Sequence, residues 1–154
     1  MPNLLVYASV NCFVKTKLHA KYLAKLDVDI ITIDRDINRE IENIRHIKKE
    51  TGKEIQILLN EGCIRDCPFR NTHFNILSHC DNEHELQFTN LIEGESCTPF
   101  LKQNRRYFFQ IPFVRPEDLS RYEGVVDIFK LTTRTLDTKR IELQLLAYAA
   151  EKYE

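Results

Sequence analysis

No stretch of this sequence is apolar for the roughly 20 residues that a helix needs to cross a bilayer. The N-terminus lacks the basic residues and the apolar run of a secretion signal. Neither sign of charge is in excess: 22 Lys and Arg offset 23 Asp and Glu, so the net charge of −1 does not indicate binding to nucleic acid or membranes. Linkers rich in Gly, Ser or Pro are also missing. We therefore expect a single cytoplasmic domain over 1–154.

Short apolar runs do occur, and segments with helical periodicity separate them. Leu4–Val10, apolar at nearly every position, is typical of a strand buried on both faces. The sequence predicts about five strands: Leu4–Val10, Asp29–Asp34, Glu54–Asn60, a short run near Gln110–Val114, and Val125–Leu131. Because alternating strands and helices form right-handed βαβ units, we predict an α/β fold with a parallel sheet.

Capping residues and apolar stripes predict the helices between these strands. Thr16, Asp36 and Asp137 are expected N-caps, and Gly52 and Gly124 are expected to end helices. Three apolar stripes are expected along the helices: Leu18, Tyr22 and Leu26; Ile37, Ile41, Ile44 and Ile47; and Ile141, Leu145, Tyr148 and Ala149.

The βα repeat is interrupted over 61–106, where only one helix is expected, from Phe69 to His79. A long irregular segment inside a compact α/β domain usually serves a function. We therefore divide the single domain into βα repeats over 1–60, a cysteine-bearing insertion over 61–106, and closing βα units over 107–154.

Four of the five cysteines lie in this insertion, with the spacing C-x3-C-x12-C-x16-C: Cys63, Cys67, Cys80 and Cys97. Without a secretion signal, clustered thiols indicate metal or redox chemistry before disulfides. Four converging thiolates repel one another unless a cation or cluster neutralises them, and four cysteines are the usual ligands of iron–sulfur clusters. Structural zinc usually shows C-x2-C pairs, and none occurs here. Zinc and unliganded buried cysteines remain the alternatives.

Two stretches of the chain, NEGCIRDCPFRNTHFNILSHC and FVRPEDLSRYEGVVDIFKLTTRT, resemble signature stretches of the collagenase-like peptidase family (peptidase family U, number 32). The resemblance implies a TIM-like barrel and a four-iron four-sulfur (4Fe-4S) cluster on Cys63, Cys67, Cys80 and Cys97. It also implies oxygen-independent hydroxylation of quinone precursors or ribosomal RNA for some members, whereas others are labelled proteases.

The chain departs from that family pattern in two respects. A whole barrel needs eight βα units, and this sequence supplies about five, so we expect a partial TIM-like (β/α) barrel that resembles the later portion of the family. A missing N-terminal segment or a partner chain is then expected to complete it. The sequence also shows neither a nucleophile elbow around a serine nor an H-E-x-x-H motif, so no residue pattern supports the protease label.

Chemistry in parallel barrels gathers where the strands end. The polar residues and cysteine expected there are Asn11, Cys12, Asp34, Arg35, Asn60, Glu61, Arg115, Lys130 and Arg134. The candidate catalytic residues are Glu61, His73, Arg115 and Lys130. The candidate substrate-binding residues are Asn60, Arg70, Arg115, Lys130 and Arg134.

Two of these candidates also have simpler interpretations. Lys130 closes an apolar strand, where an unpaired ammonium is costly, so it either binds an anion, forms an ordinary ion pair or already lies in solvent. Arg115 either clamps an anion or ties a helix start to the sheet. Three functional classes follow: an iron–sulfur hydroxylase or redox enzyme acting on an aromatic or RNA-derived substrate, a collagenase-like peptidase, and a non-catalytic domain stapled by a metal.

Overall fold

The computed structural model describes residues 4–79, 97–132 and 136–152. The chain forms two compact units. Met1–Glu61 and Pro112–Glu154 make up the first unit, and Gly62–Ile111 makes up the second. The insertion expected over 61–106 therefore falls almost wholly within the second unit.

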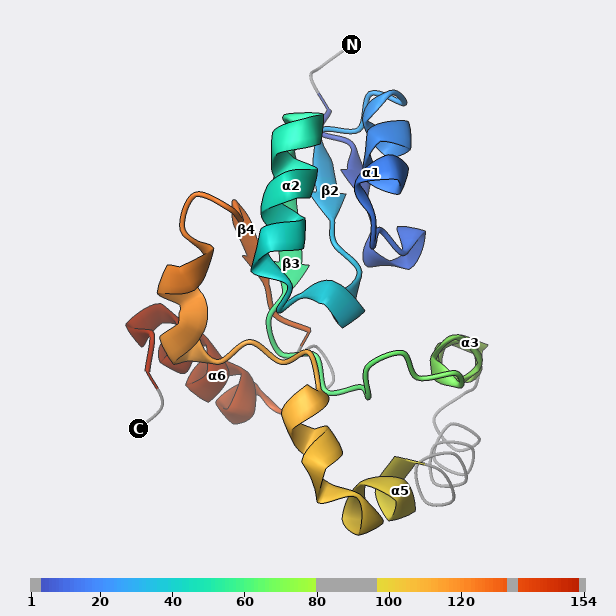
Figure 1. Ribbon diagram of the computed structural model, residues 1–154. Coiled ribbons are helices and arrows are strands. Elements are labelled where there is room, and N and C mark those ends of the chain that lie inside the picture. The colour runs from blue at the N-terminus through green and yellow to red at the C-terminus, as the bar shows by residue number, and fades with distance from the viewer. Residues whose placement is uncertain (1–3, 80–96, 133–135, 153–154) are drawn as a thin grey trace. The chain divides into compact units, whose positions relative to one another are not determined.

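A parallel sheet organises the first unit (Figure 1). Its strands are β1 (Tyr7–Ala8), β2 (Ile30–Thr32), β3 (Glu54–Leu58) and β4 (Ile128–Lys130), and they lie side by side in the order β1-β2-β3-β4. Ile31 pairs with Ile55 across β2 and β3, and Ile57 pairs with Phe129 across β3 and β4. The parallel α/β architecture is as the alternating pattern predicted.

The strand expected near Gln110–Val114 does not form. Gln110 instead ends a 3-10 helix, η4 (Arg105–Gln110), and residues 112–114 run without regular structure. The Val114 N–H still donates to the carbonyl of Leu59 at 2.9 Å, so this segment lies beside the end of β3 without joining the sheet. A single hydrogen bond does not extend a ladder, which is why an apolar pattern alone overestimated the strand count.

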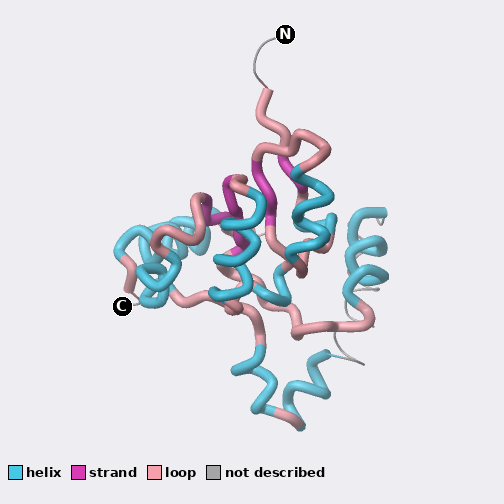
Figure 2. The backbone as a smooth tube through the Cα atoms, turned by 45° about the horizontal axis from the view of Figure 1, so that its top comes forward, coloured by secondary structure: helices cyan, strands magenta, loops and turns pink. Residues whose placement is uncertain are grey.

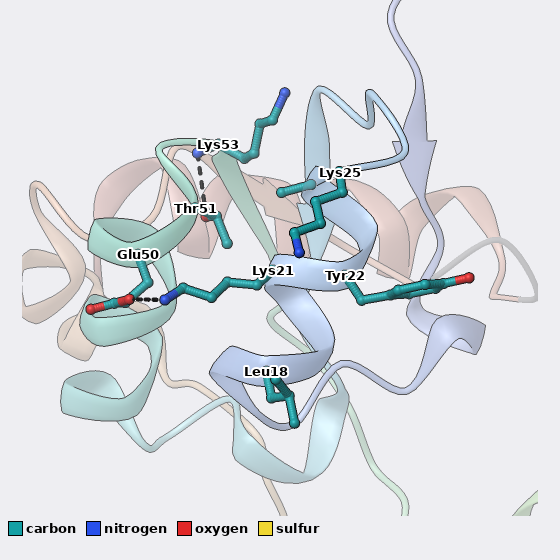
Figure 3. Close-up of a pocket in the computed structure, with 8 residues that line it drawn as sticks. Leu18, Lys21, Tyr22, Lys25, Glu50, Thr51 and Lys53 are labelled. Carbon is teal, nitrogen blue, oxygen red and sulfur yellow. Dashed lines mark hydrogen bonds and ion pairs between the residues drawn. The ribbon is translucent and has the colours of Figure 1, made fainter.

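The first helix, α1 (Lys17–Ala24), begins as expected, because the Thr16 side chain accepts a hydrogen bond from the N–H of His19. Its buried contact is Ala20, whereas Leu18 and Tyr22 are exposed, Leu18 by 77% (Figure 3). Helix α1 packs against α2 (Ile41–Thr51). The small Ala20 side chain suits that close approach, and it leaves the larger apolar side chains on the outer face.

Helix α2 starts later than the sequence predicted. Asp36 does not cap it, because Arg35–Ile37 forms a separate 3-10 helix, η2, whose own cap is the Asp34 side chain. Helix α2 ends at Gly52, which has a φ of 63° and therefore adopts the left-handed conformation that glycine tolerates.

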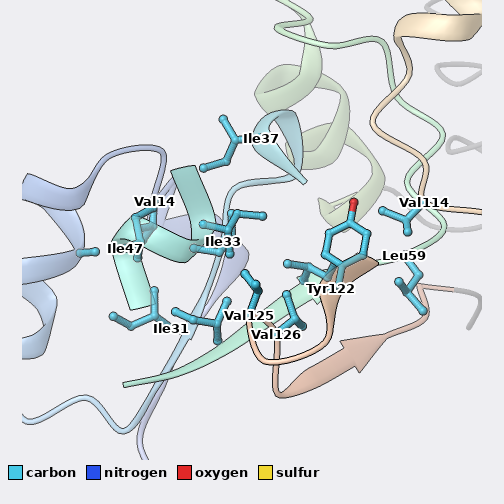
Figure 4. Packing of buried hydrophobic residues seen from close by; sticks show 14 of the residues in the cluster. Val14, Ile31, Ile33, Ile37, Ile47, Leu59, Val114, Tyr122, Val125 and Val126 are labelled. Atoms are coloured by element: carbon cyan, nitrogen blue, oxygen red, sulfur yellow. The ribbon is translucent and has the colours of Figure 1, made fainter. Parts of the chain in front are cut away.

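Alternate side chains of β2 and β3, which share one face of the sheet, contribute to one apolar core (Figure 4). Isoleucine supplies most of its fully buried side chains: Ile31, Ile33, Ile44, Ile47, Ile55 and Ile57. Burying one such side chain stabilises the fold by about 1.5–3 kcal/mol. Tyr122 closes one side of this core and donates its hydroxyl to the carbonyl of Asn38 at 2.9 Å. Burial raises the pKa of Tyr122 to about 12.

The first strand is not buried as predicted. Only Ala8 lies in the core, and the preceding residues Leu4, Leu5, Val6 and Tyr7 are exposed, Leu5 by 66%. β1 pairs with β2 on one side, and among the described residues no strand pairs with its other side. The apolar run is therefore an open sheet edge.

Five further elements complete the described chain (Figure 2), the first of which is the short 3-10 helix η1 (Val10–Cys12). The second unit holds α3 (Arg70–His79), close to its expected bounds, and α5 (Thr98–Gln103). The first unit holds η5 (Pro116–Tyr122) and α6 (Thr138–Ala150). No helix of the described ranges has the length and apolar character required to span a bilayer.

The last helix is capped as the sequence predicted, because the Asp137 side chain accepts from the N–H of Arg140 at 3.0 Å. Its expected core stripe is wrong, however. Only Tyr148 is buried, and Leu145 and Ala149 are exposed. The Tyr148 hydroxyl donates to the carbonyl of Val114 at 2.7 Å, which anchors α6 to the segment beside β3.

Candidate functional site

Charged side chains collect where the parallel strands end, an edge that we call the carboxyl edge. Asp34 follows β2 within two residues, Asn60 and Glu61 follow β3, and Lys130 ends β4. Parallel strands end on the same side of a sheet, so these residues share one edge, as the sequence predicted. Ligand sites of parallel α/β folds lie at this edge.

Arg35 and Glu61 form a buried ion pair at the carboxyl edge. Their side chains are 8% and 9% exposed, and an Arg35 guanidinium nitrogen lies 3.2 Å from Glu61 Oε2. Removing one member of a buried pair leaves an uncompensated charge, at a cost of about 3–5 kcal/mol. This pair therefore fixes the position of the Glu61 carboxylate, which the sequence had identified only as a catalytic candidate.

A second charged group lies beside β2. Lys15 follows Val14, whose backbone bridges to Ile33, and its ammonium lies 2.7 Å from Asp36 Oδ2 and 4.0 Å from Asp34 Oδ1. Both carboxylates are almost fully buried, while Lys15 is partly exposed. Sequence reasoning did not place Lys15 beside Asp36, because their proximity depends on the register between the chain after η1 (Val10–Cys12) and β2.

Asn38 is a further buried polar residue that sequence reasoning missed. Its side chain is fully buried and its Nδ2 donates to the carbonyls of Leu58 and Pro112. It thereby links the segment after β2 to the end of β3. A buried amide is typical of a position that needs specific hydrogen bonds, which no periodicity in the sequence reports.

Asn60, a candidate substrate-binding residue, is fully engaged within the first unit. Its Oδ1 accepts from the N–H and hydroxyl of Thr132 at 2.7 and 3.0 Å, and its Nδ2 donates to Gln144 at 3.0 Å. These bonds tie the end of β3 to the chain after β4 and to α6. A role in positioning neighbouring segments accounts for this geometry.

Lys130 and Arg115 are both exposed at the protein surface. Lys130 is not a buried ammonium, so of its possible interpretations the solvated charge is the one that the structure supports. Arg115 binds Asp118 through two hydrogen bonds, of 2.9 and 3.2 Å, within the first turn of η5. The Arg115 guanidinium lowers the pKa of Asp118, and the Asp118 carboxylate raises the pKa of Arg115.

The second unit presents Cys63 and Cys67 on one tight turn. The Cys67 N–H donates to the carbonyl of Ile64 at 3.2 Å, and the Arg70 N–H donates to the carbonyl of Cys67 at 3.3 Å. The Arg70 side chain then returns to the turn: its Nε lies 3.4 Å from Cys63 Sγ and its Nη2 lies 2.7 Å from the Ile64 carbonyl. Asp66 completes the turn at a φ of 51°.

The other predicted site residues are less completely defined. Cys97 precedes α5 and is half-buried, and His73 lies on α3 with its ring 6.1 Å from that of Phe74. Cys80 and Arg134 fall outside the described residues. Cys12, Cys63, Cys67 and Cys97 are not joined in disulfides. Within the described ranges, no three His, Cys, Asp or Glu side chains are gathered so that they could hold a metal ion.

The described part of the second unit has no buried apolar side chain. None of the buried apolar side chains of the described chain belongs to Gly62–Ile111, whereas Phe69, Phe108 and Phe109 are exposed there. The second unit therefore lacks, in its described part, the apolar core that stabilises the first unit.

A groove of about 720 Å³ lies between α1, the end of α2 and the start of β3 (Figure 3). Leu18 and Tyr22 contribute apolar surface, and Lys21 pairs with Glu50 across it. The groove reaches Lys53, which precedes β3, so it lies toward the opposite end of the strands from the carboxyl edge. Surface lysines and exposed apolar side chains alone do not identify a ligand.

Comparison with curated proteins finds similarity to an uncharacterized protease of Methanocaldococcus jannaschii. The two are 34% identical over 128 residues, which is 83% of this chain and 38% of that protein. The chain thus spans well under half the length of the curated relative that it matches. No model of a known protein family matches the chain, and no solved structure matches it.

Proposed function

We propose that this chain is the cluster-bearing part of an enzyme of the collagenase-like peptidase family, and that Cys63, Cys67, Cys80 and Cys97 hold a 4Fe-4S cluster. The observation that carries the proposal is the contrast in burial. All four cysteines lie in the second unit, whose described residues contribute nothing to the apolar core.

A small unit whose described residues form no apolar core needs another source of stability. Domains below about 70–80 residues rarely obtain enough from burial alone, and metals or disulfides usually supply the remainder. The thiols of Cys63, Cys67 and Cys97 are not joined in disulfides. Metal–thiolate bonds would supply this stability, and their binding free energy would then contribute directly to folding.

The donor set fits an iron–sulfur cluster chemically. Four cysteine thiolates are its usual ligands, and Cys63 and Cys67 already share one turn. Among the described residues, Cys63, Cys67 and Cys97 do not form a group that could hold a metal ion, so cluster binding would require these thiols to move closer together. When bound, such a cluster supplies electron transfer or activation of a substrate oxygen.

We also propose that the first unit forms part of a TIM-like barrel. Its strand order follows the chain order, as in a singly wound barrel. Its buried charges lie at the carboxyl edge, where barrels bind substrate. The open side of β1 would then pair with a further strand, from a preceding segment or from a partner chain.

Anaerobic purification followed by iron, sulfide and zinc analysis tests the cluster. We expect four iron and four sulfide per chain and visible absorbance that dithionite bleaches. Cys63→Ser should remove or destabilise the cluster. Cys12→Ser is the matched control, because Cys12 is also a half-buried free thiol but lies in the first unit. A colourless chain with one bound zinc would instead support the metal-stapled, non-catalytic domain.

A peptidase is the second candidate, favoured by the name of the relative from Methanocaldococcus jannaschii. Glu61 is the acid that we would assign to it, because the carboxylate is buried and held by Arg35 at the carboxyl edge. Incubation with gelatin and with a collagen-like peptide tests this function. Because Glu61→Gln leaves the buried Arg35 charge uncompensated, it should lower stability, so cleavage is measured at a temperature where circular dichroism shows the variant still folded. Cleavage that Glu61→Gln abolishes under those conditions, with any bound iron unchanged, would establish this function. Cleavage that survives Glu61→Gln would remove Glu61 from that role.

A further inference from the structure

Arg70 stands apart from every other described residue of the second unit. It is 6% exposed, and no other side chain described in Gly62–Ile111 is buried. A guanidinium is among the least favourable groups to remove from water, so its burial requires specific hydrogen bonds and a nearby negative charge. The position of Arg70 therefore reflects an interaction and not hydrophobic packing.

The bonds of Arg70 converge on the turn that presents Cys63 and Cys67. Its Nε donates to Cys63 Sγ at 3.4 Å, within the range of hydrogen bonds to sulfur, while its Nη2 donates to the Ile64 carbonyl at 2.7 Å. The same carbonyl accepts from the Cys67 N–H. One planar side chain thus holds the sulfur of the first cysteine and the backbone between the two cysteines.

From this geometry we propose that Arg70 is a positioning residue for the cysteine site, an inference that rests on the proposed function. It holds Cys63 and Cys67 in place before the cluster binds. Once the cluster is bound, the N–H···S hydrogen bond and the positive charge of Arg70 would stabilise the more negative, reduced form of the cluster.

Two properties of arginine make this role specific. Its fork of donors can hold the sulfur and the carbonyl simultaneously, whereas the ammonium of lysine is a single point charge. Hydrogen bonds to the sulfurs are also one of the determinants of the reduction potential of an iron–sulfur cluster. The same residue had been a candidate for substrate binding, and two of its donors are directed instead to its own turn.

Arg70→Gln and Arg70→Lys test the proposal in the full chain, reconstituted anaerobically with ferrous iron and sulfide. Arg65→Gln is the matched control, because Arg65 lies in the same turn but is exposed and pairs with Asp66 at 3.6 Å. Two quantities are measured: the iron retained under chelator challenge, and the midpoint potential of the clusters that remain.

Arg70→Gln should weaken iron retention by about 10- to 100-fold, as is usual when a residue supporting a metal ligand is lost. The midpoint potential should shift to a more negative value. Arg70→Lys should retain iron less well than the wild-type chain, with a smaller shift in potential, because it preserves the charge but not the fork. Arg65→Gln should change neither quantity.

The proposal is overturned if Arg70→Gln retains iron as the wild-type chain does, or if its remaining clusters have the wild-type potential. A residue with a purely structural role would lower iron retention without changing that potential. If Arg70→Gln loads no cluster, Arg70→Lys decides, and wild-type loading with wild-type potential in that variant refutes the fork. Failure of the wild-type chain itself to bind iron and sulfide would reject the proposed function instead.

Discussion

The two units of this chain differ in how they are held together. The first has an isoleucine-rich core around a parallel sheet, with its ion pairs placed at the margins of that core. The second contributes no buried apolar side chain among its described residues, and its only buried side chain there is the Arg70 guanidinium. Apolar packing therefore explains the first unit, whereas in the second unit the proposed cluster would supply the stability that the described side chains do not.

Removal of the proposed cluster should produce the largest difference in stability between the two units. In Cys63→Ser, or after iron chelation, we expect the second unit to lose its protection while the first remains folded, because metal binding and folding are coupled. Hydrogen exchange resolved by segment measures this difference. Unchanged exchange across Gly62–Ile111 in iron-free protein would show that the second unit is stable without a metal.

A cavity in the core of the first unit should have a smaller effect, and it should lower the stability of that unit alone. Ile57 is fully buried in β3, so Ile57→Ala should lower the free energy of unfolding of the first unit by about 2–5 kcal/mol. Chemical denaturation followed by circular dichroism measures it. Iron content should not change. Leu143→Ala, at an exposed position of α6, is the control and should cost less than about 0.5 kcal/mol.

A weaker effect is expected at Asp127, whose contribution to the stability of the first unit depends on pH. Burial favours a higher pKa for this carboxyl, but hydrogen bonds from Lys48 and from the Ile55 N–H outweigh it and leave the pKa below its usual value. Its stabilisation is therefore complete above the unfolded pKa of about 3.9 and is lost as the pH falls through the lower, folded pKa.

Asp127→Asn should accordingly reduce the loss of stability on acidification. Thermal unfolding of both proteins from neutral pH down to about pH 3 checks this sign. Parallel curves for the two proteins over that range would mean that the two hydrogen bonds do not depend on the carboxylate charge.

The open edge of β1 should promote self-association of the chain, and a charge introduced there should affect this association more than the unfolding temperature. The Val6 carbonyl accepts from Asp29 and Ile30 N–H groups, so the alternation of a parallel strand turns the Tyr7 backbone toward the open side. Unpaired, apolar sheet edges promote association, and we expect the isolated chain to self-associate. Leu5→Lys should reduce this association in sedimentation experiments, with little change in unfolding temperature.

Ser120→Lys is the control for this prediction, because it adds the same charge at an exposed position away from β1. A wild-type chain that remains monomeric at high concentration would contradict the prediction. Equal loss of association in both variants would attribute it to net charge, and not to the apolar edge.

Much of the carboxyl edge could be predicted from the sequence, but its pairing could not. The ends of the apolar runs placed Asp34, Arg35 and Glu61 at that edge, since strand ends are local features. Arg35 pairs with Glu61 because the strands that precede them, β2 and β3, are adjacent in the sheet. Lys15 was missed for the same reason. Lys130 was identified by its position in the chain, although its exposure depends on the place of β4 at the edge of the described sheet.

The sequence alone determined the helix boundaries that depend on a few neighbouring residues. The caps at Thr16 and Asp137 and the stop at Gly52 are examples, because each requires only hydrogen bonds or a backbone conformation within one turn. Tertiary structure decided which apolar residues are buried. Leu5 and Leu18 read as core and are exposed, because burial depends on which elements lie alongside, and only the packed chain supplies those neighbours.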